Sequence, residues 1–177
     1  MKIVSSIFLF LSINLYASKS SLNFLHGLWE GHATHVMPNG EAISMTSAEC
    51  VYGKLGGRIG VVEGRHIKED GLLGFGTYAV LSPIDVEGKY RFSIYLNEGT
   101  TREATANIDA DKKEWNWSFD VLPKVSGQPI IEIRYTITLA NGQWNEIGHS
   151  STDKGLHWKQ FFEMKLDRKA DTCTGFQ

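Results

Sequence analysis

The residues of this sequence that could do chemistry are its histidines, its carboxylates and its two cysteines, Cys50 and Cys173. His32 and His35 form an H-x-x-H pair, a spacing that on a helix can hold a metal ion. On a strand, an offset of three residues puts the two side chains on opposite faces, so no metal site is predicted. Single positions on the surface or at a rim suit the histidines better. If the predicted strands close into a barrel, His35 is the histidine expected at its mouth.

No spacing in the sequence points to a catalytic group. The nucleophile elbow Gly-x-Ser-x-Gly is absent. Glu63, Glu146 and Glu163 fall in segments predicted as strands, but nothing fixes two of these carboxylates at a working distance. An inward glutamate is more often part of a buried ion pair or an anchor for a ligand. The arginines considered as its partners are Arg58, Arg65 and Arg134.

Residues 1–17 have the organisation of a secretory signal peptide. Lys2 supplies a positive start, an uncharged apolar stretch follows, and Ala17 offers a small residue before a cut. The stretch is too short to span a bilayer. The alternative is a buried N-terminal helix, which the polar residues 18–21 disfavour. We expect an exported protein, periplasmic or secreted, with one β-barrel domain over residues 18–177.

Charge and hydropathy narrow the choice of partners. The formal net charge of the whole chain is −2, with both signs scattered along it. Such a balance gives no reason to expect nucleic acid or an anionic membrane as a partner. No segment after the leader is long and apolar enough to be a membrane helix.

Turn residues recur at short intervals along the rest of the chain and separate segments rich in β-branched and aromatic residues. Short links without long crossovers indicate antiparallel neighbours. About ten such strands are best protected by closing into an up-and-down barrel, preceded by a short helical turn at residues 20–25. An open two-sheet sandwich is the alternative. The predicted strands are 26–36, 41–53, 57–68, 72–81, 88–97, 101–109, 113–122, 129–140, 143–151 and 155–168.

Alternation along these strands predicts which side chains face the interior. A ten-stranded barrel is wider than one that its own side chains fill, so an internal cavity is expected. Its lining is predicted to be mainly aromatic, which suits an apolar ligand held by one or two polar groups. The alternative is that the aromatic residues fill the barrel as core. The predicted lining is Tyr78, Tyr90, Trp115, Trp117, Tyr135 and Trp158, with His35 near the mouth.

Four motifs carry a resemblance to a known family. They are Gly27-Leu28-Trp29-Glu30-Gly31, Leu55-Gly56-Gly57-Arg58, Gly74-Phe75-Gly76-Thr77-Tyr78 and the closing segment with Trp158, Glu163 and Arg168. In this order and spacing the chain resembles the DUF1579 family from about Phe24 to Arg168. These are small bacterial barrels, often exported, related in shape to lipocalins, fatty-acid-binding proteins and nitrobindins.

The resemblance implies how the barrel closes. In calycin-type barrels an arginine of the last strand covers the tryptophan of the first strand, which here implies Arg168 over Trp29 in a cation–π contact. Gly27 and Gly31 flank that tryptophan and let the backbone pass close to it.

The two cysteines form either a disulfide or two free thiols, and an oxidising compartment favours the pair. In a closed ring of ten strands, the last strand lies beside the first. The end of the second strand therefore lies about 10 Å away, within reach of a short tail. This arrangement favours a Cys50–Cys173 disulfide.

Haem is the cofactor to weigh, because nitrobindin-like barrels hold it through a histidine. This chain departs from their pattern: after Trp29-Glu30-Gly31 it has His32-Ala33-Thr34-His35 in place of a Tyr-Pro-Thr step. It also has no Cys-x-x-Cys-His segment for covalent attachment. We therefore expect no cofactor, with haem as the alternative.

Three functions follow from this interpretation. The first is a barrel that binds a small apolar or amphipathic molecule in its interior. The second is an isomerase or hydrolase acting on such a molecule, which an inward carboxylate–histidine pair would favour. The third is a filled structural barrel with a protein partner, which an exposed apolar patch would favour.

Overall fold

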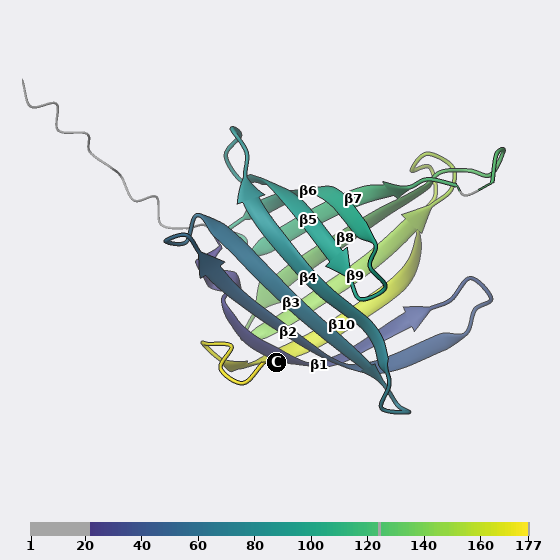
Figure 1. Ribbon diagram of the computed structural model, residues 1–177. Helices are drawn as coiled ribbons and strands as arrows, with labels where there is room; N and C mark the ends of the chain where they lie inside the picture. Colours follow the sequence, from purple (N-terminus) through teal and green to yellow (C-terminus); the bar gives the residue numbers. More distant parts are fainter. Residues whose placement is uncertain (1–21, 124, 177) are drawn as a thin grey trace, which may run out of the picture.

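A computed structural model describes residues 22–123 and 125–176 of the chain. A short 3-10 helix, η1 (Asn23–Leu25), precedes ten antiparallel strands that close into one barrel (Figure 1). Each strand pairs with its neighbours in sequence, and the first pairs with the last. The predicted closed barrel is confirmed, and the open sandwich is excluded. The strands are β1 (Gly27–Val36), β2 (Ala42–Lys54), β3 (Ile59–Lys68), β4 (Leu73–Pro83), β5 (Lys89–Leu96), β6 (Thr101–Asp109), β7 (Glu114–Val121), β8 (Ile131–Ala140), β9 (Gln143–Ser151) and β10 (Lys159–Ala170).

The predicted signal peptide, residues 1–17, lies outside the described residues. Among the residues that are described, no helix has the length and apolar character needed to cross a membrane.

Glycine is required where β1 and β10 close the barrel. A Cβ atom at Gly31 would lie 2.9 Å from the Cα atom of Leu166 and would also meet the carbonyl oxygen of Lys165. Gly27 has φ of +130° and lies against the carbonyl oxygen of Ala170, so both its conformation and its surroundings exclude a side chain. The two glycines therefore let β10 approach β1 closely.

The end of the barrel that η1 covers is packed with tryptophan, and we call it the closed end. Trp29 is 2% exposed, and its Nε1 donates a hydrogen bond to the carbonyl oxygen of Leu25 in η1. The Trp29 and Trp144 rings meet edge to face at 5.7 Å, and Trp144 meets Trp115 in the same way at 6.0 Å. The guanidinium of Arg168 lies over the Trp29 ring, 5.3 Å from its centre. This end of the barrel is solid core.

A disulfide ties the chain's last segment to the closed end. Cys50 of β2 is bonded to Cys173, which follows β10, and their Cα atoms are 5.6 Å apart. Cys50 also pairs with Leu28 at the start of β1. The prediction that the two cysteines are bonded to each other is confirmed.

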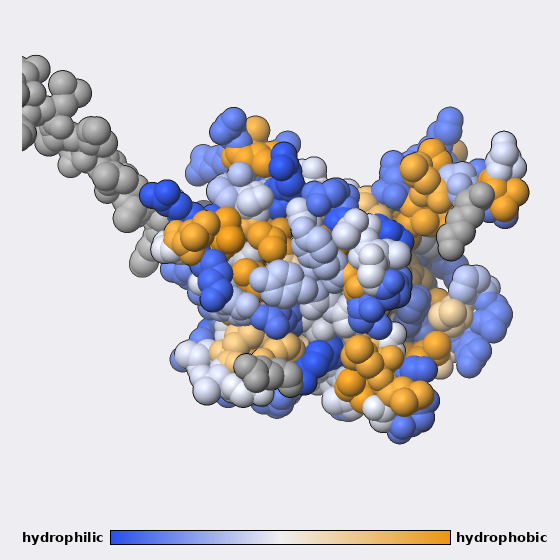
Figure 2. Space-filling view, viewed as in Figure 1, coloured by the Kyte–Doolittle hydropathy of each residue, from blue (hydrophilic) through white to orange (hydrophobic). Residues whose placement is uncertain are grey.

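The opposite end of the barrel, the open end, carries the β1–β2, β3–β4, β5–β6, β7–β8 and β9–β10 connections, because strand direction alternates. Several large apolar side chains are exposed in these connections, among them Leu72, Leu122 and Val125. Figure 2 shows apolar residues gathered on the loops at the ends of the strands, with a more polar barrel wall between them. The cavity described below reaches this end.

Candidate functional site

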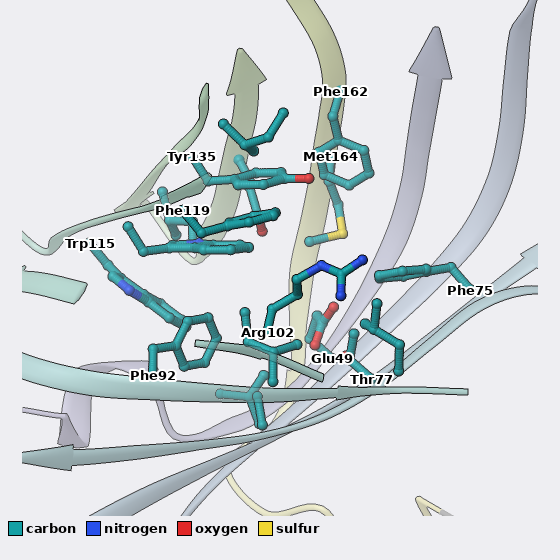
Figure 3. Close-up of a pocket in the computed structure, with 18 of the residues that line it drawn as sticks. Glu49, Phe75, Thr77, Phe92, Arg102, Trp115, Phe119, Tyr135, Phe162 and Met164 are labelled. Carbon is teal, nitrogen blue, oxygen red and sulfur yellow. The ribbon is translucent and has the colours of Figure 1, made fainter. Parts of the chain in front are cut away.

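The barrel encloses a cavity of about 290 Å³. It extends from Trp115 and Trp144, next to the closed end, to Arg102 and Val121 near the open end, and most of its wall is aromatic or aliphatic (Figure 3). The lining residues are Glu49, Val62, His66, Phe75, Thr77, Ala79, Phe92, Ile94, Leu96, Arg102, Trp115, Trp117, Phe119, Val121, Ile133, Tyr135, Ile137, Trp144, Glu146, Phe161, Phe162 and Met164.

One side of the cavity is a stacked aromatic wall built by β7 and β8. The rings of Trp117 and Tyr135, which are register partners, stack 4.2 Å apart and 9° from parallel. Phe119 continues the stack at 5.7 Å from Trp117. Phe92 of β5 meets Trp115 and Trp117 edge-on, each at 5.1 Å. These rings hold one another in place, so the wall is formed before any ligand binds.

Facing this wall, Glu49 of β2 and His66 of β3 form a buried polar pair. His66 Nε2 lies 3.3 Å from Glu49 Oε1, and the two side chains are 4% and 8% exposed. The other ring nitrogen, Nδ1, lies 2.8 Å from Ser47 Oγ. Ser47 and Glu49 are two residues apart on β2 and share a face, and Ser47 is the register partner of His66. The sheet therefore sets the orientation of the imidazole.

Glu49 brings an unsatisfied oxygen to the cavity. Among the described residues, none gives its buried Oε2 a hydrogen-bond partner. The carboxylate occupies room left by Gly64, where an added Cβ would lie 2.7 and 2.8 Å from the two carboxylate oxygens. Buried polar atoms in proteins are nearly always paired, so an orphaned one in a cavity wall points to a ligand or a bound water.

Glu146 of β9 is the second carboxyl group in the wall. Burial, followed by the nearby charge of Glu49, raises the pKa of Glu146 to about 8, although a hydrogen bond from Trp144 acts in the opposite direction. Trp144 Nε1 donates that bond to Glu146 Oε2 over 3.2 Å. At neutral pH, Glu146 is therefore mostly protonated and can donate a hydrogen bond. Burial and the Glu146 charge also raise the pKa of Tyr135.

Two further features bear on what the cavity can hold. Arg102, near the start of β6, extends into the cavity (Figure 3) and donates a hydrogen bond to the carbonyl oxygen of Thr101 over 2.8 Å. The indole nitrogens of Trp115 and Trp117 are buried and have no hydrogen-bond partner within the described parts of the chain. The cavity therefore offers an apolar volume with a few polar groups at fixed positions, as small-molecule sites do.

The structure brings together three of the residues that the sequence predicts in the lining: Trp115, Trp117 and Tyr135. Tyr90 is buried in the core but does not line the cavity. His35 packs edge-on against Phe161 at 5.5 Å and Phe162 at 6.5 Å, outside the cavity wall. Burial lowers the pKa of His35.

The expectation that Tyr78 faces the interior is wrong. Its side chain is 44% exposed on the outer surface, where its ring lies 6.5 Å from that of Tyr95. Leu81 of β4 is fully buried and faces the interior. Because every second residue of a strand shares a face, Ala79 and Thr77 face the cavity with it and Tyr78 points outward. The small residues of β4 face inward, and they leave space that a tyrosine would fill.

The expectation that Trp158 faces the interior is also wrong, and a β-bulge is the reason. The register between β10 and β9 shifts between Gln160 and Phe162, which inserts one extra residue into β10. Phe161 and Phe162 therefore both line the cavity, and the residues before them exchange faces. Trp158 lies outside, with the guanidinium of Arg134 3.9 Å from its ring centre.

Most of the charged groups of the cavity are not predicted there from the sequence. Of the glutamates on predicted strands, Glu146 lines the cavity, whereas Glu63 accepts a hydrogen bond from the Tyr52 hydroxyl on the outer surface and Glu163 pairs with Lys165. The arginines considered as partners lie elsewhere: Arg58 in an exposed turn, Arg65 over Phe176 and Arg134 over Trp158.

Glu49, His66 and Arg102 line the cavity but are not predicted there from the sequence. Alternation along β2 could have revealed Glu49, because it shares a face with Met45, Ser47 and Val51.

The residues present do not fit a haem group. His66 is the histidine in the cavity wall, and both of its ring nitrogens are engaged, by Ser47 and Glu49. An axial ligand needs one nitrogen free to face the iron. His35, the other histidine near the cavity, packs against phenylalanine rings and contributes nothing to the wall.

The closed ten-stranded antiparallel barrel fits a calycin-like fold. The chain is similar to the crystal structure of Rv2717c from M. tuberculosis, with a TM-score of 0.62 and 12% sequence identity over 84% of this chain and 97% of that one. At this identity the likeness shows the fold alone. No family model matches the chain, so the resemblance to DUF1579 remains a prediction, and no curated protein matches it either.

Proposed function

We propose that this protein is an exported barrel that holds one small apolar or amphipathic molecule in its interior. The observation that carries the proposal is the cavity of about 290 Å³ with an aromatic wall and a few buried polar groups. Pockets for small molecules range from about 300 to 1,000 Å³. The cavity lies at the lower end of that range and suits a ligand of one or two rings or a short chain.

Two observations support export. The first is the signal-peptide pattern of residues 1–17. The second is the Cys50–Cys173 disulfide, because disulfides persist in oxidising compartments and are rare in the cytosol.

The proposal is tested by titrating the protein with an apolar fluorescent probe. The parent protein is expected to bind it, and Ala79→Phe is expected to abolish binding because Ala79 lines the cavity. Overpacking of this kind costs about 1–3 kcal/mol, so unfolding by urea checks that the variant still folds. Val80→Phe is the matched control, since Val80 points to the opposite face of β4. A parent protein that binds no apolar probe would contradict the proposal.

A proton-transfer enzyme is the second candidate, because the Glu49–His66 pair is the inward carboxylate–histidine pair that such a function needs. Glu49 would take a proton from carbon next to a ligand carbonyl, and the protonated Glu146 would donate one to the carbonyl oxygen, giving an enol. Deuterium exchange into a small cyclic ketone, measured by NMR, separates the candidates. Exchange that is lost in Glu49→Gln favours the enzyme.

A further inference from the structure

The chemistry of the ligand can be read from the oxygen of Glu49 that lacks a partner. Glu49 is nine-tenths buried and its side chain lies in the cavity wall (Figure 3). Its Oε1 faces His66, whereas its Oε2 has no partner among the described residues. An ionised carboxylate only accepts hydrogen bonds, so the group that completes this site must carry an N–H or O–H donor.

The electrostatics of the wall favour a donor that is positively charged. A second carboxyl group, Glu146, lies close enough for the charge of Glu49 to oppose its ionisation. Like charges disfavour each other in a buried site, and a cation placed beside them relieves that repulsion. A carboxylate ligand in the same position would add a third acidic group and increase it.

The aromatic wall favours the same charge. Trp115, Trp117, Tyr135 and Phe92 line the cavity, and the faces of aromatic rings attract ammonium groups. Arg102 is the cationic side chain that reaches the cavity from β6, and the structure forms no ion pair between it and Glu49. Its hydrogen bond goes to the carbonyl oxygen of Thr101.

We propose that the molecule bound in this cavity is an apolar amine, with a protonated amino group that donates to Glu49 Oε2 and an aromatic or short aliphatic body packed against the β7–β8 wall. This inference rests on the proposed ligand-binding function and names the class of ligand for that same cavity. An uncharged alcohol of the same shape binds more weakly, because it lacks the charge-assisted hydrogen bond.

The test is calorimetric titration with three probes of one shape: phenylbutylamine, phenylbutanol and phenylbutanoate. We expect the amine to bind at least about tenfold more tightly than the alcohol, and the carboxylate to bind most weakly. Glu49→Gln removes the charge and is expected to abolish the preference for the amine. Glu163→Gln is the matched control, because Glu163 pairs with Lys165 on the outer surface of β10.

Proton release gives a second measurement that needs no variant at Glu49. Bound amine favours the ionised form of Glu146, so at neutral pH binding should release a proton, detected by titration in buffers of different ionisation enthalpy. Glu146→Gln should still bind the amine but release no proton. The titratable groups facing the cavity are Glu49 of β2, His66 of β3, Arg102 of β6, Tyr135 of β8 and Glu146 of β9.

The outcomes separate the two proposals. If the alcohol or the carboxylate binds as tightly as the amine, or if Glu49→Gln keeps the preference, the amine inference is overturned and the binding function stands. If Arg102→Gln abolishes amine binding, the inference is also overturned, because removing a nearby positive charge should strengthen that binding. If none of the three probes binds and the apolar fluorescent probe does not bind either, the ligand-binding function falls together with the inference.

Discussion

Glu146 shows how a single residue makes this barrel wall unlike an ordinary core. The wall around it is mostly apolar, so its carboxyl group loses hydration, and Trp144 donates a hydrogen bond to it. Burial and the neighbouring Glu49 keep the proton on Glu146 well above the pH at which a free glutamate loses it. Such a group costs stability when it ionises, and its retention in the cavity is consistent with a role in holding a ligand.

The protonation of Glu146 predicts how stability varies with pH. The pKa of Glu146 rises from 4.5 to about 8 on folding. The folded state therefore binds more protons than the unfolded state between these values, and its stability is lost as the pH rises through them. Relative to Glu146→Gln, the parent protein should lose on the order of 1.4 kcal/mol of unfolding free energy for each pH unit in that window.

The test is to measure the unfolding free energy of the parent protein and of Glu146→Gln in urea between about pH 5 and about pH 9. Glu163→Gln is the control, because it removes a carboxylate that pairs with Lys165 and does not line the cavity. A constant difference in stability between the parent protein and Glu146→Gln across this range would show that Glu146 titrates normally.

At the scale of the strands, regularity decides what could be predicted from the sequence. The regular alternation of β7 and β8 placed Trp115, Trp117 and Tyr135 correctly. The extra residue in β10 cannot be detected from the sequence, because Phe161 and Phe162 are both apolar and either one could face the interior. The predicted face of Trp158 is wrong for this reason. The closed barrel followed from short links between successive strands.

The polar pair of the cavity was harder to predict. Glu49 and His66 lie on different strands, and their contact depends on a register that alternation within one strand does not give. Their spacing along the chain matches no motif for a metal or a nucleophile. Physical pairing across a sheet, not sequence proximity, creates this part of the site.

Gly64 is the position where β3 makes room for that pair, and this predicts the effect of adding one methyl group. In Gly64→Ala the new Cβ would lie 2.5 Å from Thr77 Oγ1 and 2.7 Å from Glu49 Oε1, so the carboxylate must move. We expect a loss of about 1–3 kcal/mol in unfolding free energy, as for other overpacked interiors, together with weaker binding of the amine probe.

Gly76→Ala is the matched control for this change. Gly76 lies on β4, has no positive φ, and an added Cβ would approach its nearest neighbours at 3.4 Å, an ordinary contact. Urea unfolding and probe titration of both variants provide the measurement. Equal stability and equal probe affinity of the two variants would be incompatible with the placement of the Glu49 carboxylate beside Gly64.

At the scale of the whole molecule, the barrel divides into a fastened half and a hollow half. The closed end holds η1, the Trp29–Arg168 contact and the disulfide, and its core is packed. The cavity begins beside the closed-end residues Trp115 and Trp144 and extends towards connections that expose apolar side chains such as Leu72 and Leu122. The contacts that fasten the closed end and the residues that line the cavity are therefore largely different sets.

This division predicts that breaking the disulfide will affect stability and leave binding unchanged. Cys50 and Cys173 are 123 residues apart in sequence, so the bond restrains a large part of the unfolded chain. A disulfide typically stabilises a protein by about 2–4 kcal/mol, and one that closes a loop of this length lies at or above the upper end of that range. The double variant Cys50→Ala/Cys173→Ala should lose that amount of unfolding free energy in urea and bind the apolar probe with the affinity of the parent protein.

Reductant is the control for this change. It should destabilise the parent protein to the same extent and have no effect on the variant. A fall in probe affinity that accompanies the loss of stability would mean that the closed end and the cavity are coupled, since neither Cys50 nor Cys173 lines the cavity.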